Sequence, residues 1–330
     1  MATTVWGKSN RPLLWILGLM AAGFLGVGVI GYRVTQTPSA ETEIQNLTVP
    51  VERENLALEI KASGTVVMGV RQGGGGLSYA ISAQKYGGFH VAICEQIVTE
   101  LEKKLGKKLE IKYQPVTSLN RITSVANGEV DMECGVTTNN ATRQRDVSFV
   151  VTTFVEEVRM AVRADSDIKS VAQLDGKTLA STAGTTTLPT IRKQQRGANL
   201  EIKEILAKDD GESFELLVSG KADAFVMDSQ ILAGAIANAK KPSDFKIVGD
   251  ALSVEPIAIM IRKDDPAFKK VADDTVRQLV KSGEISKLYD KWFLQAIPPK
   301  GIKLNLPASA NTTAAWANLN DKPAEAYPMK

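Results

Sequence analysis

Short apolar runs alternate with amphipathic helical patterns from Thr65 to Phe293. Runs such as Thr65–Val70 and Ala224–Met227 contain β-branched or aromatic residues and are typical of buried strands. Gly88–Leu105 instead places apolar residues at three- and four-residue steps, which indicates a helix with one buried face. Strands that alternate with helices predict an α/β fold in which mostly parallel sheets are covered by helices on both faces.

Composition excludes several classes of function. The chain has 330 residues, 44% of them hydrophobic and 23% charged, with a net charge of +3 and no long basic run. A nucleic-acid surface is therefore not indicated. With two cysteines in no CxxC spacing and a single histidine, His90, the chain offers neither a structural zinc site nor a histidine-based catalytic triad other than through His90.

The two cysteines, Cys94 and Cys134, leave two interpretations open. Cys94 lies on the core face of the first predicted helix, and Cys134 lies at the end of a nearby predicted strand. Export would permit a disulfide between them, and two buried free thiols fit the pattern equally well.

The N-terminus carries a targeting pattern. Lys8 and Arg11 precede an apolar run, Leu13–Ile30, which is long for a signal peptide and nearly long enough to span a bilayer. We predict that residues 1–32 are a signal peptide, cleaved near Ala40, or an uncleaved membrane anchor. In both cases the body lies beyond the membrane, because the positive charges stay inside. Residues 33–62 are polar and are predicted to be a linker.

The stretch Asp131–Arg145 has the composition of a carboxylate site. We predict a buried strand at Val130–Cys134, a polar turn that contains Thr138, and then the first turn of a helix that carries Arg143. A helix N-terminus attracts negative charge, and an arginine fork matches the two oxygens of a carboxylate. The alternative interpretation is an ordinary helix capped by Asn140.

Further ligand groups follow other predicted strands. Gly184–Thr187 is a second hydroxyl-rich helix start, and Asp228 ends a buried strand, where it can accept an ammonium or cap the helix that begins at Ser229. Arg71 ends the first strand, at the edge where open α/β sheets bind ligands. The glycines at 73–76 lack the following Gly-Lys-Ser/Thr of a phosphate-binding loop and are predicted to form a flexible loop.

These motifs together resemble the periplasmic solute-binding proteins of polar amino-acid ABC importers (family 3), and most of all the glutamate/aspartate-binding branch. The resemblance covers about residues 60–305 and rests on TSLNRITSVANGEVDMECGVTTNNATRQR, AGTTT, ILAKDDGESFELLVSGKADAFVMD, IRKDDPAFKKVADDTVRQLVKSGEISKLYDKWF and IPPKGIKLNL. It implies a two-lobe periplasmic binding protein fold (type II), in which two α/β lobes are joined by two hinge strands and close over the ligand. The expected parts are lobe 1 (63–155 and 254–297), lobe 2 (156–253) and a C-terminal tail (298–330) that lies along the surface.

The resemblance also implies a role for each candidate residue. Those that match the family's ligand contacts are Arg143, Thr138 and Thr186 for the α-carboxylate, Asp228 for the α-ammonium, and Arg71, Ser118 and Arg121 for the ligand side chain.

Two positions depart from the acidic-ligand pattern: Val136 replaces a serine near the ammonium, and Asp210 replaces a histidine near the side-chain carboxylate. If the ligand side chain is a carboxylate, Asp210 repels it unless Asp210 is protonated or paired, and Arg71 and Arg121 are available to neutralise the two carboxylates. Alternatively, Asp210 accepts the NH2 of a ligand amide. The expected ligands are therefore glutamate, aspartate and their amides.

The resemblance implies a binding protein without catalytic residues, cofactor or metal, which works as a monomer and delivers an amino acid to a membrane permease. Two alternative functions remain open. An enzyme on the same fold, dehydratase-like, would use Asp209 and Asp210 as an acid/base pair or Cys134 as a nucleophile, although Asp-Asp-Gly is a common turn. A membrane-tethered amino-acid sensor would need a partner protein, because the chain holds no signalling segment.

Overall fold

The structure, a computed structural model, describes residues 55–327. Within this range the chain forms two five-stranded sheets and one three-stranded sheet. The predicted signal peptide or anchor and most of the predicted linker lie outside the described residues. Among the helices that the structure describes, none is both long and apolar enough to cross a membrane.

The first large sheet, with the strand order β5-β1-β6-β13-β7, belongs to the first lobe. Its strands are β1 (Thr65–Val70), β5 (Glu110–Pro115), β6 (Met132–Glu133), β7 (Val147–Phe149) and β13 (Met260–Arg262). β1 runs parallel to β5 and β6, whereas β13 runs antiparallel to β6 and β7. Four of the five strands therefore point the same way, as predicted, and β13 makes the sheet mixed because the chain re-enters it from the second lobe in the opposite direction.

Helices α2 (Leu56–Ser63), α3 (Phe89–Leu105), α4 (Arg121–Ala126), α8 (Pro266–Lys281) and α9 (Glu284–Phe293) belong to the same lobe. All of α2 except its last residue lies in the segment predicted to be linker, 33–62. Its Leu56 and Ile60 are buried in the core that also contains residues of α3 and α8. Asn55 caps the helix by accepting a hydrogen bond from the N–H of Ala57. The folded body thus begins earlier than the polar composition of the segment indicates.

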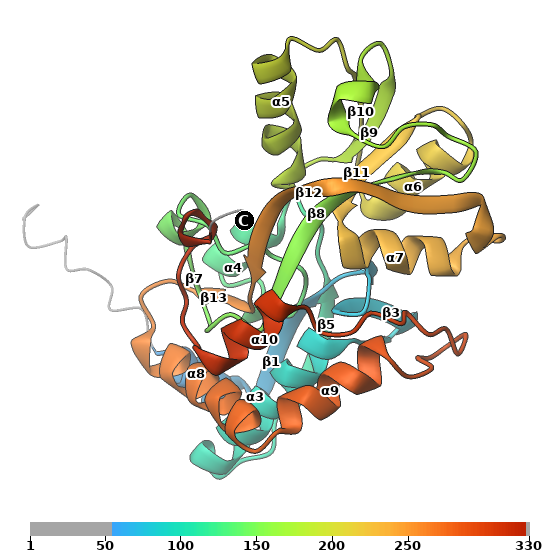
Figure 1. Ribbon diagram of the computed structural model, residues 1–330. Coiled ribbons are helices and arrows are strands. Elements are labelled where there is room, and N and C mark those ends of the chain that lie inside the picture. Colours follow the sequence, from blue (N-terminus) through green and yellow to red (C-terminus); the bar gives the residue numbers. More distant parts are fainter. Residues whose placement is uncertain (1–54, 328–330) are drawn as a thin grey trace, which may run out of the picture. The chain divides into compact units, whose positions relative to one another are not determined.

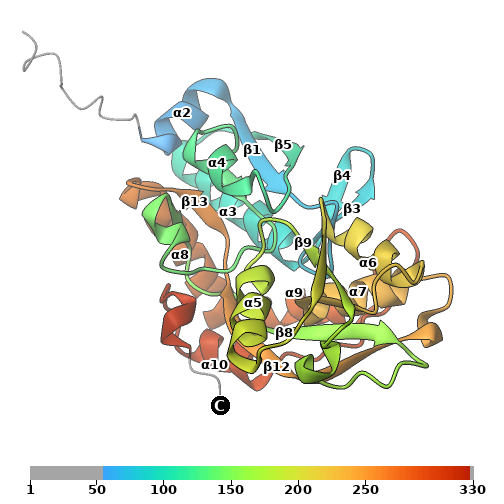
Figure 2. The ribbon, with the colours of Figure 1, turned by 90° about the horizontal axis from the view of Figure 1, so that it is seen from above.

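The second large sheet has the order β10-β9-β11-β8-β12. Its strands are β8 (Phe154–Arg163), β9 (Thr178–Thr182), β10 (Lys203–Ala207), β11 (Ala224–Asp228) and β12 (Phe245–Ile257). Helix α5 (Thr187–Ala198) covers one face, and α6 (Asp210–Val218) and α7 (Ser229–Asn238) cover the other (Figures 1 and 2). This sheet is also mixed, since β9 runs parallel to β10 and β11 whereas β8 runs antiparallel to β11 and β12.

The long antiparallel pair β8 and β12 connects the two lobes (Figure 1). They are the two hinge strands that the resemblance implies, and β12 is longer than its sequence pattern indicates. The register shifts between Val248 and Ser253, where Gly249 has a positive φ of 79° and Asp250 is exposed. A bulge of this kind interrupts the alternation of buried and exposed residues, and so it hides a long strand from sequence patterns.

The glycines after β1 are ordered by close contacts and do not form a flexible loop. Gly73–Gly74 is strand β2, which pairs with β3 (Ser78–Ser82), and β3 pairs with β4 (Lys85–Gly87). Gly75 has a φ of 60°, and a Cβ there would lie 2.0 Å from Oε1 of Gln230 in the second lobe. Glycine at this position therefore allows the backbone of one lobe to contact the other.

The C-terminal tail is more structured than predicted. It contains helix α10 (Ala310–Ala317), which packs on hinge strand β8. The buried Thr312 exchanges hydrogen bonds with the backbone of Val155, and the indole N–H of Trp316 donates to the carbonyl of Thr153 at 2.8 Å. The tail thus supports the base of the hinge.

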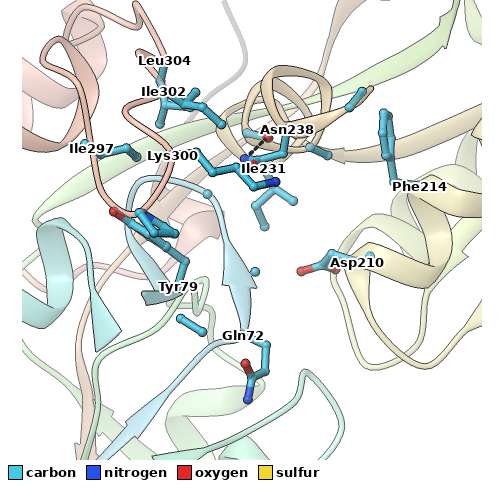
Figure 3. Close-up of a pocket in the computed structure, with 18 of the residues that line it drawn as sticks. Gln72, Tyr79, Asp210, Phe214, Ile231, Asn238, Ile297, Lys300, Ile302 and Leu304 are labelled. Atoms are coloured by element: carbon cyan, nitrogen blue, oxygen red, sulfur yellow. Dashed lines mark hydrogen bonds between the residues drawn. The ribbon is translucent and has the colours of Figure 1, made fainter. Parts of the chain in front are cut away.

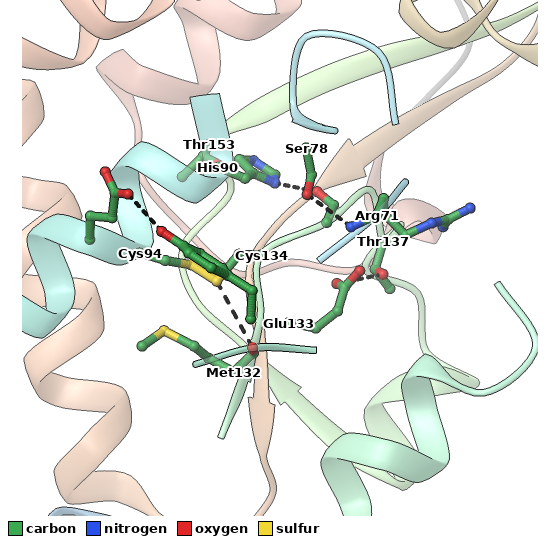
Figure 4. Close-up of a disulfide and its surroundings, with 12 residues drawn as sticks. Arg71, Ser78, His90, Cys94, Met132, Glu133, Cys134, Thr137 and Thr153 are labelled. Carbon is green, nitrogen blue, oxygen red and sulfur yellow. Dashed lines mark hydrogen bonds between the residues drawn. A yellow bond between two sulfur atoms is a disulfide. The ribbon is translucent and has the colours of Figure 1, made fainter. Parts of the chain in front are cut away.

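A disulfide joins the two cysteines, which settles the choice that the sequence left open. Cys94 of α3 and Cys134, which follows β6, have Cα atoms 6.3 Å apart and are separated by 40 positions in sequence (Figure 4). His90, one turn before Cys94, is fully buried between the carbonyl of Gly135 and the hydroxyl of Thr153, each 2.7 Å from a ring nitrogen. The carbonyl can only accept, so Nδ1 carries the proton of a neutral ring.

Candidate functional site

Six of the eight predicted ligand-binding residues line one small cavity between the two large sheets. The cavity measures about 10 Å³ and is lined by Arg71, Ser118, Arg121, Val136, Thr138, Thr185, Thr186, Met227, Asp228 and Ile231. The other two predicted residues adjoin it, since Arg143 is bonded to Thr138 and Asp210 to Arg71. A space of this size holds about one water molecule, so an amino acid can enter only if the two lobes separate.

Arg143 connects the two lobes at one end of this cavity. It lies in a single 3₁₀ turn, Arg143–Arg145, and not at the start of the α-helix that was predicted. The N-cap of this turn is Thr142 and not Asn140, although the side chain of Asn140 accepts the N–H of Arg143 at 2.8 Å. The guanidinium donates to the carbonyl of Thr138 at 2.7 Å and to that of Gly184, across the cleft, at 3.5 Å. The cradle therefore relies on the guanidinium and not on a helix dipole.

The two predicted threonines converge on one carboxylate oxygen. The hydroxyls of Thr138 and Thr186, one from each lobe, donate to Oε2 of Glu255 at 2.5 and 2.6 Å. Ser253 donates to the other oxygen of Glu255 at 2.8 Å. Glu255 lies on hinge strand β12 and is buried. The arrangement shows that these hydroxyls can hold a carboxylate between the lobes.

Asp228 is available to a ligand because another residue caps the helix behind it. The side chain of Asp228 makes no capping hydrogen bond to α7. Instead Glu156 of hinge strand β8 accepts the Ser229 hydroxyl at 2.5 Å and the N–H of Gln230 at 3.4 Å. Burial first, and then the charges of Glu255 and Glu156, raise the pKa of Asp228 well above its ordinary value. An ammonium at this position would relieve that repulsion.

Two further arginines, Arg71 and Arg121, line the cavity. Nη2 of Arg71 pairs with Oδ2 of Asp210 at 3.0 Å, and both side chains are buried, 5% and 6% exposed. Arg121 donates from Nη1 to the carbonyl of Val136. Burial, followed by the charges of Arg143 and Arg71, lowers the pKa of Arg121 to about 9, so it remains a cation at neutral pH.

Three buried acids around the site were missed in the sequence: Glu133, Glu156 and Glu255. Glu133 is fully buried beside the arginines and accepts the Thr137 hydroxyl at 2.7 Å (Figure 4). All three lie on strands. In the sequence, the feature that could have indicated these buried acids is a single charged residue within a predicted strand. Among the described residues, no cluster of His, Cys, Asp and Glu side chains is arranged to hold a metal ion.

The side chains that the enzyme hypothesis requires are engaged in structural interactions. The sulfur of Cys134 is bonded to Cys94 and provides no nucleophile. Asp209 caps α6 by accepting the N–H of Glu212 at 2.9 Å, while Asp210 pairs with Arg71. The two neighbouring aspartates therefore point to different partners and do not form an acid/base pair.

Comparison with known proteins identifies the family. Residues 66–295 match the model of the bacterial extracellular solute-binding proteins, family 3. This chain belongs to that family. Its relatives are binding proteins and not enzymes, and the chain is likewise a solute-binding protein of the type that serves ABC importers.

Relatives of known name cover most of the chain. The "Glutamate/aspartate import solute-binding protein" of Escherichia coli (strain K12) is 42% identical over 80% of this chain and 88% of its own length. The "L-glutamate/L-aspartate-binding protein" of Pseudomonas aeruginosa is 40% identical over 84% and 94%. Among solved structures, a mutant of ArgBP from T. maritima has a TM-score of 0.64 at 28% identity, covering 72% of this chain and 98% of that one.

Proposed function

We propose that this chain is the extracytoplasmic binding component of an ABC importer for polar amino acids, namely glutamate, aspartate, glutamine or asparagine. One observation carries the proposal: two hydroxyls that can hold a carboxylate line the same cavity as an unshared acid, Asp228, and the guanidinium of Arg143 adjoins them. A carboxylate and an ammonium on one carbon define an α-amino acid. The names of the relatives support the acidic ligands and their amides as candidates.

The proposed mechanism is capture by lobe closure. The open lobes admit the ligand, closure removes water from its charged groups, and the permease recognises the closed form. Residues of both lobes line the cavity, as this mechanism requires. We expect the protein to act as a monomer.

Calorimetric titration with the four amino acids tests the proposal. We expect at least one of them to bind with a Kd below about 100 μM, which corresponds to about −5.5 kcal/mol. An unrelated amino acid such as leucine serves as the control. If none of the four binds in this range, the proposed ligand class is wrong.

The proposal also concerns the N-terminal residues. We propose that Leu13–Ile30 exports the protein and is either cleaved near Ala40 or kept as an anchor in the inner membrane. The mass of the protein isolated from its host distinguishes the two. Recovery from the cytoplasm with the apolar run intact would contradict both.

A further inference from the structure

The side-chain end of the site differs from the end that holds the α-amino and α-carboxyl groups. Arg143, Thr138 and Thr186 suit the α-carboxylate, and Asp228 suits the ammonium. Of the remaining polar groups around the cavity, the hydroxyl of Thr185 already donates to the carbonyl of Thr182. Arg71, Ser118, Arg121 and Asp210 are then available to the ligand side chain. This assignment rests on the function proposed above.

Three of these groups have buried polar atoms without a hydrogen-bond partner. They are Oγ of Ser118, Nε of Arg121 and Oδ1 of Asp210. Nε of Arg121 can only donate a hydrogen bond, an ionised Oδ1 of Asp210 can only accept one, and the hydroxyl of Ser118 can do either. A ligand that satisfies all three must therefore offer both an acceptor and a donor.

The position of Asp210 makes the donor requirement specific. Its Oδ2 is already bonded to Arg71 at 3.0 Å. Asp210 projects from the start of α6 toward a larger cavity of about 420 Å³ (Figure 3), and Ile231 lines both cavities. The Arg71–Asp210 pair therefore lies between the two cavities, with Arg71 lining the small one and Asp210 the larger one, and the unpaired oxygen of Asp210 is buried there.

The charges at this end are balanced without a charged ligand side chain. Arg71 and Arg121 provide two cations, and Asp210 and the buried Glu133 provide two carboxylates. A side-chain carboxylate would add a third anion, would offer no donor to Asp210, and would compete with it for Arg71. A carboxamide adds no charge, and it offers an oxygen to Arg121 or Ser118 and an NH2 to Asp210.

We propose that this end of the site takes a carboxamide, so that the protein binds glutamine or asparagine in preference to glutamate and aspartate. Asp210 is the specificity-determining residue, because it is the group that accepts the amide NH2 and repels the acid. The larger cavity beside it leaves room for the longer side chain of glutamine.

Calorimetry on the wild-type protein at pH 7.5 tests this directly. We expect each amide to bind at least about tenfold more tightly than its acid, a factor that corresponds to about 1.4 kcal/mol. If glutamate or aspartate binds as tightly as its amide or more tightly, the proposal fails, while the function as an amino-acid binding protein stands. If none of the four binds, the proposed function itself fails.

Two variants locate the effect. Asp210→Asn removes the charge and keeps an oxygen for Arg71, so we expect the preference for the amide to fall at least about tenfold. Asp209→Asn removes a charge one residue earlier and keeps the cap of α6, since asparagine caps helices as well as aspartate. We expect this control to keep the wild-type preference. An unchanged preference in Asp210→Asn would overturn the role of Asp210, and the wild-type comparison holds whether or not the variant folds.

Discussion

At the scale of single residues, each lobe supplies half of the carboxylate cradle. Arg143 and Thr138 come from the first lobe and Thr186 from the second, and the guanidinium also contacts the carbonyl of Gly184. The α-carboxylate is common to all amino acids, so this cradle explains why an amino acid binds. We infer that the selection among amino acids takes place about Asp210, which pairs with the cavity residue Arg71.

We predict that Arg143→Ala weakens ligand binding by about 2–5 kcal/mol, or at least about 30-fold, because a buried carboxylate loses its charged partner. Arg145→Ala is the matched control, since Arg145 lies in the same turn with its side chain exposed. Calorimetry should show a large loss for the first variant and near wild-type affinity for the second. Near-normal affinity in Arg143→Ala would contradict the assignment.

A second residue-scale prediction concerns Glu156, whose pKa is raised to about 7, mainly by burial. Between pH 4.5 and 7 the folded state then holds a proton that the unfolded state has lost, so this residue makes stability fall as pH rises. His90 acts in the opposite sense, because burial lowers its pKa from 6.5 to about 4. Between pH 4 and 6.5 the unfolded state therefore binds a proton at this histidine that the folded state lacks, and the contribution of His90 makes stability rise with pH.

The two effects oppose each other between pH 4.5 and 6.5, so a variant is needed to separate them. We predict that Glu156→Gln gains stability relative to wild type by about 2–3 kcal/mol as pH rises from 4.5 to 7, at 1.36 kcal/mol per pKa unit. Urea unfolding at several pH values measures this difference. A difference that does not change with pH would show that Glu156 is ionised throughout.

At the scale of elements, the disulfide ties α3 to the strand end that leads into the ligand turn. Cys134 lies four residues before Thr138, so the bridge restrains the base of the cradle. Closing a loop of 40 residues restricts the unfolded chain and is worth about 4 kcal/mol at most.

We therefore predict that the double variant Cys94→Ala/Cys134→Ala loses about 2–4 kcal/mol of unfolding free energy. Urea unfolding of the two proteins measures the loss. Reductant should destabilise the wild type and leave the double variant unchanged. Equal stability of the two proteins would mean that the bridge does not form in the exported protein.

The elements also show how much of the molecule the sequence could predict. Strong patterns predicted β1 and α3, with bounds that differ from the structure by at most one residue. They also placed polar loops at strand ends, which marked Arg71, Thr138, Arg143, Thr186 and Asp228 as candidates. Ser118, Arg121 and Asp210 became candidates only through the resemblance to the family. Glu255 was missed because the bulge after Val248 conceals the rest of β12. The turn at Arg143 resembles a helix start in sequence because Asn140 accepts the N–H of Arg143, as a capping residue would.

Local patterns also carry no information about contacts between lobes. Asp210 was recognised as an anomaly, but its pairing with Arg71, 139 positions away, depends on how the two lobes close. The same holds for the disulfide, for which spacing alone left two possibilities. What the sequence could not predict is therefore mostly long-range and lies at the cleft.

At the scale of the whole molecule, the cleft is held by contacts that cross from one lobe to the other. They include the Arg71–Asp210 pair, the two hydroxyls on Glu255, and the close approach of Gly184 to Ser118. A Cβ on Gly184 would lie 2.6 Å from the backbone oxygen of Ser118. Because backbone on both sides has to move, a larger residue at Gly184 should prevent full closure.

We predict that Gly184→Ala weakens ligand binding at least about tenfold, because part of the binding energy is then used to accommodate the strained closed form. Gly176→Ala is the matched control: Gly176 has a similar φ, 69° against 78°, but a Cβ there meets nothing within 4 Å. Both variants should lose stability by about 1–2 kcal/mol, because alanine is strained in the left-handed region. Only Gly184→Ala should lose affinity by calorimetry and keep a larger radius of gyration in X-ray scattering with saturating ligand. If both variants bind equally well, closure does not require the contact between Gly184 and Ser118.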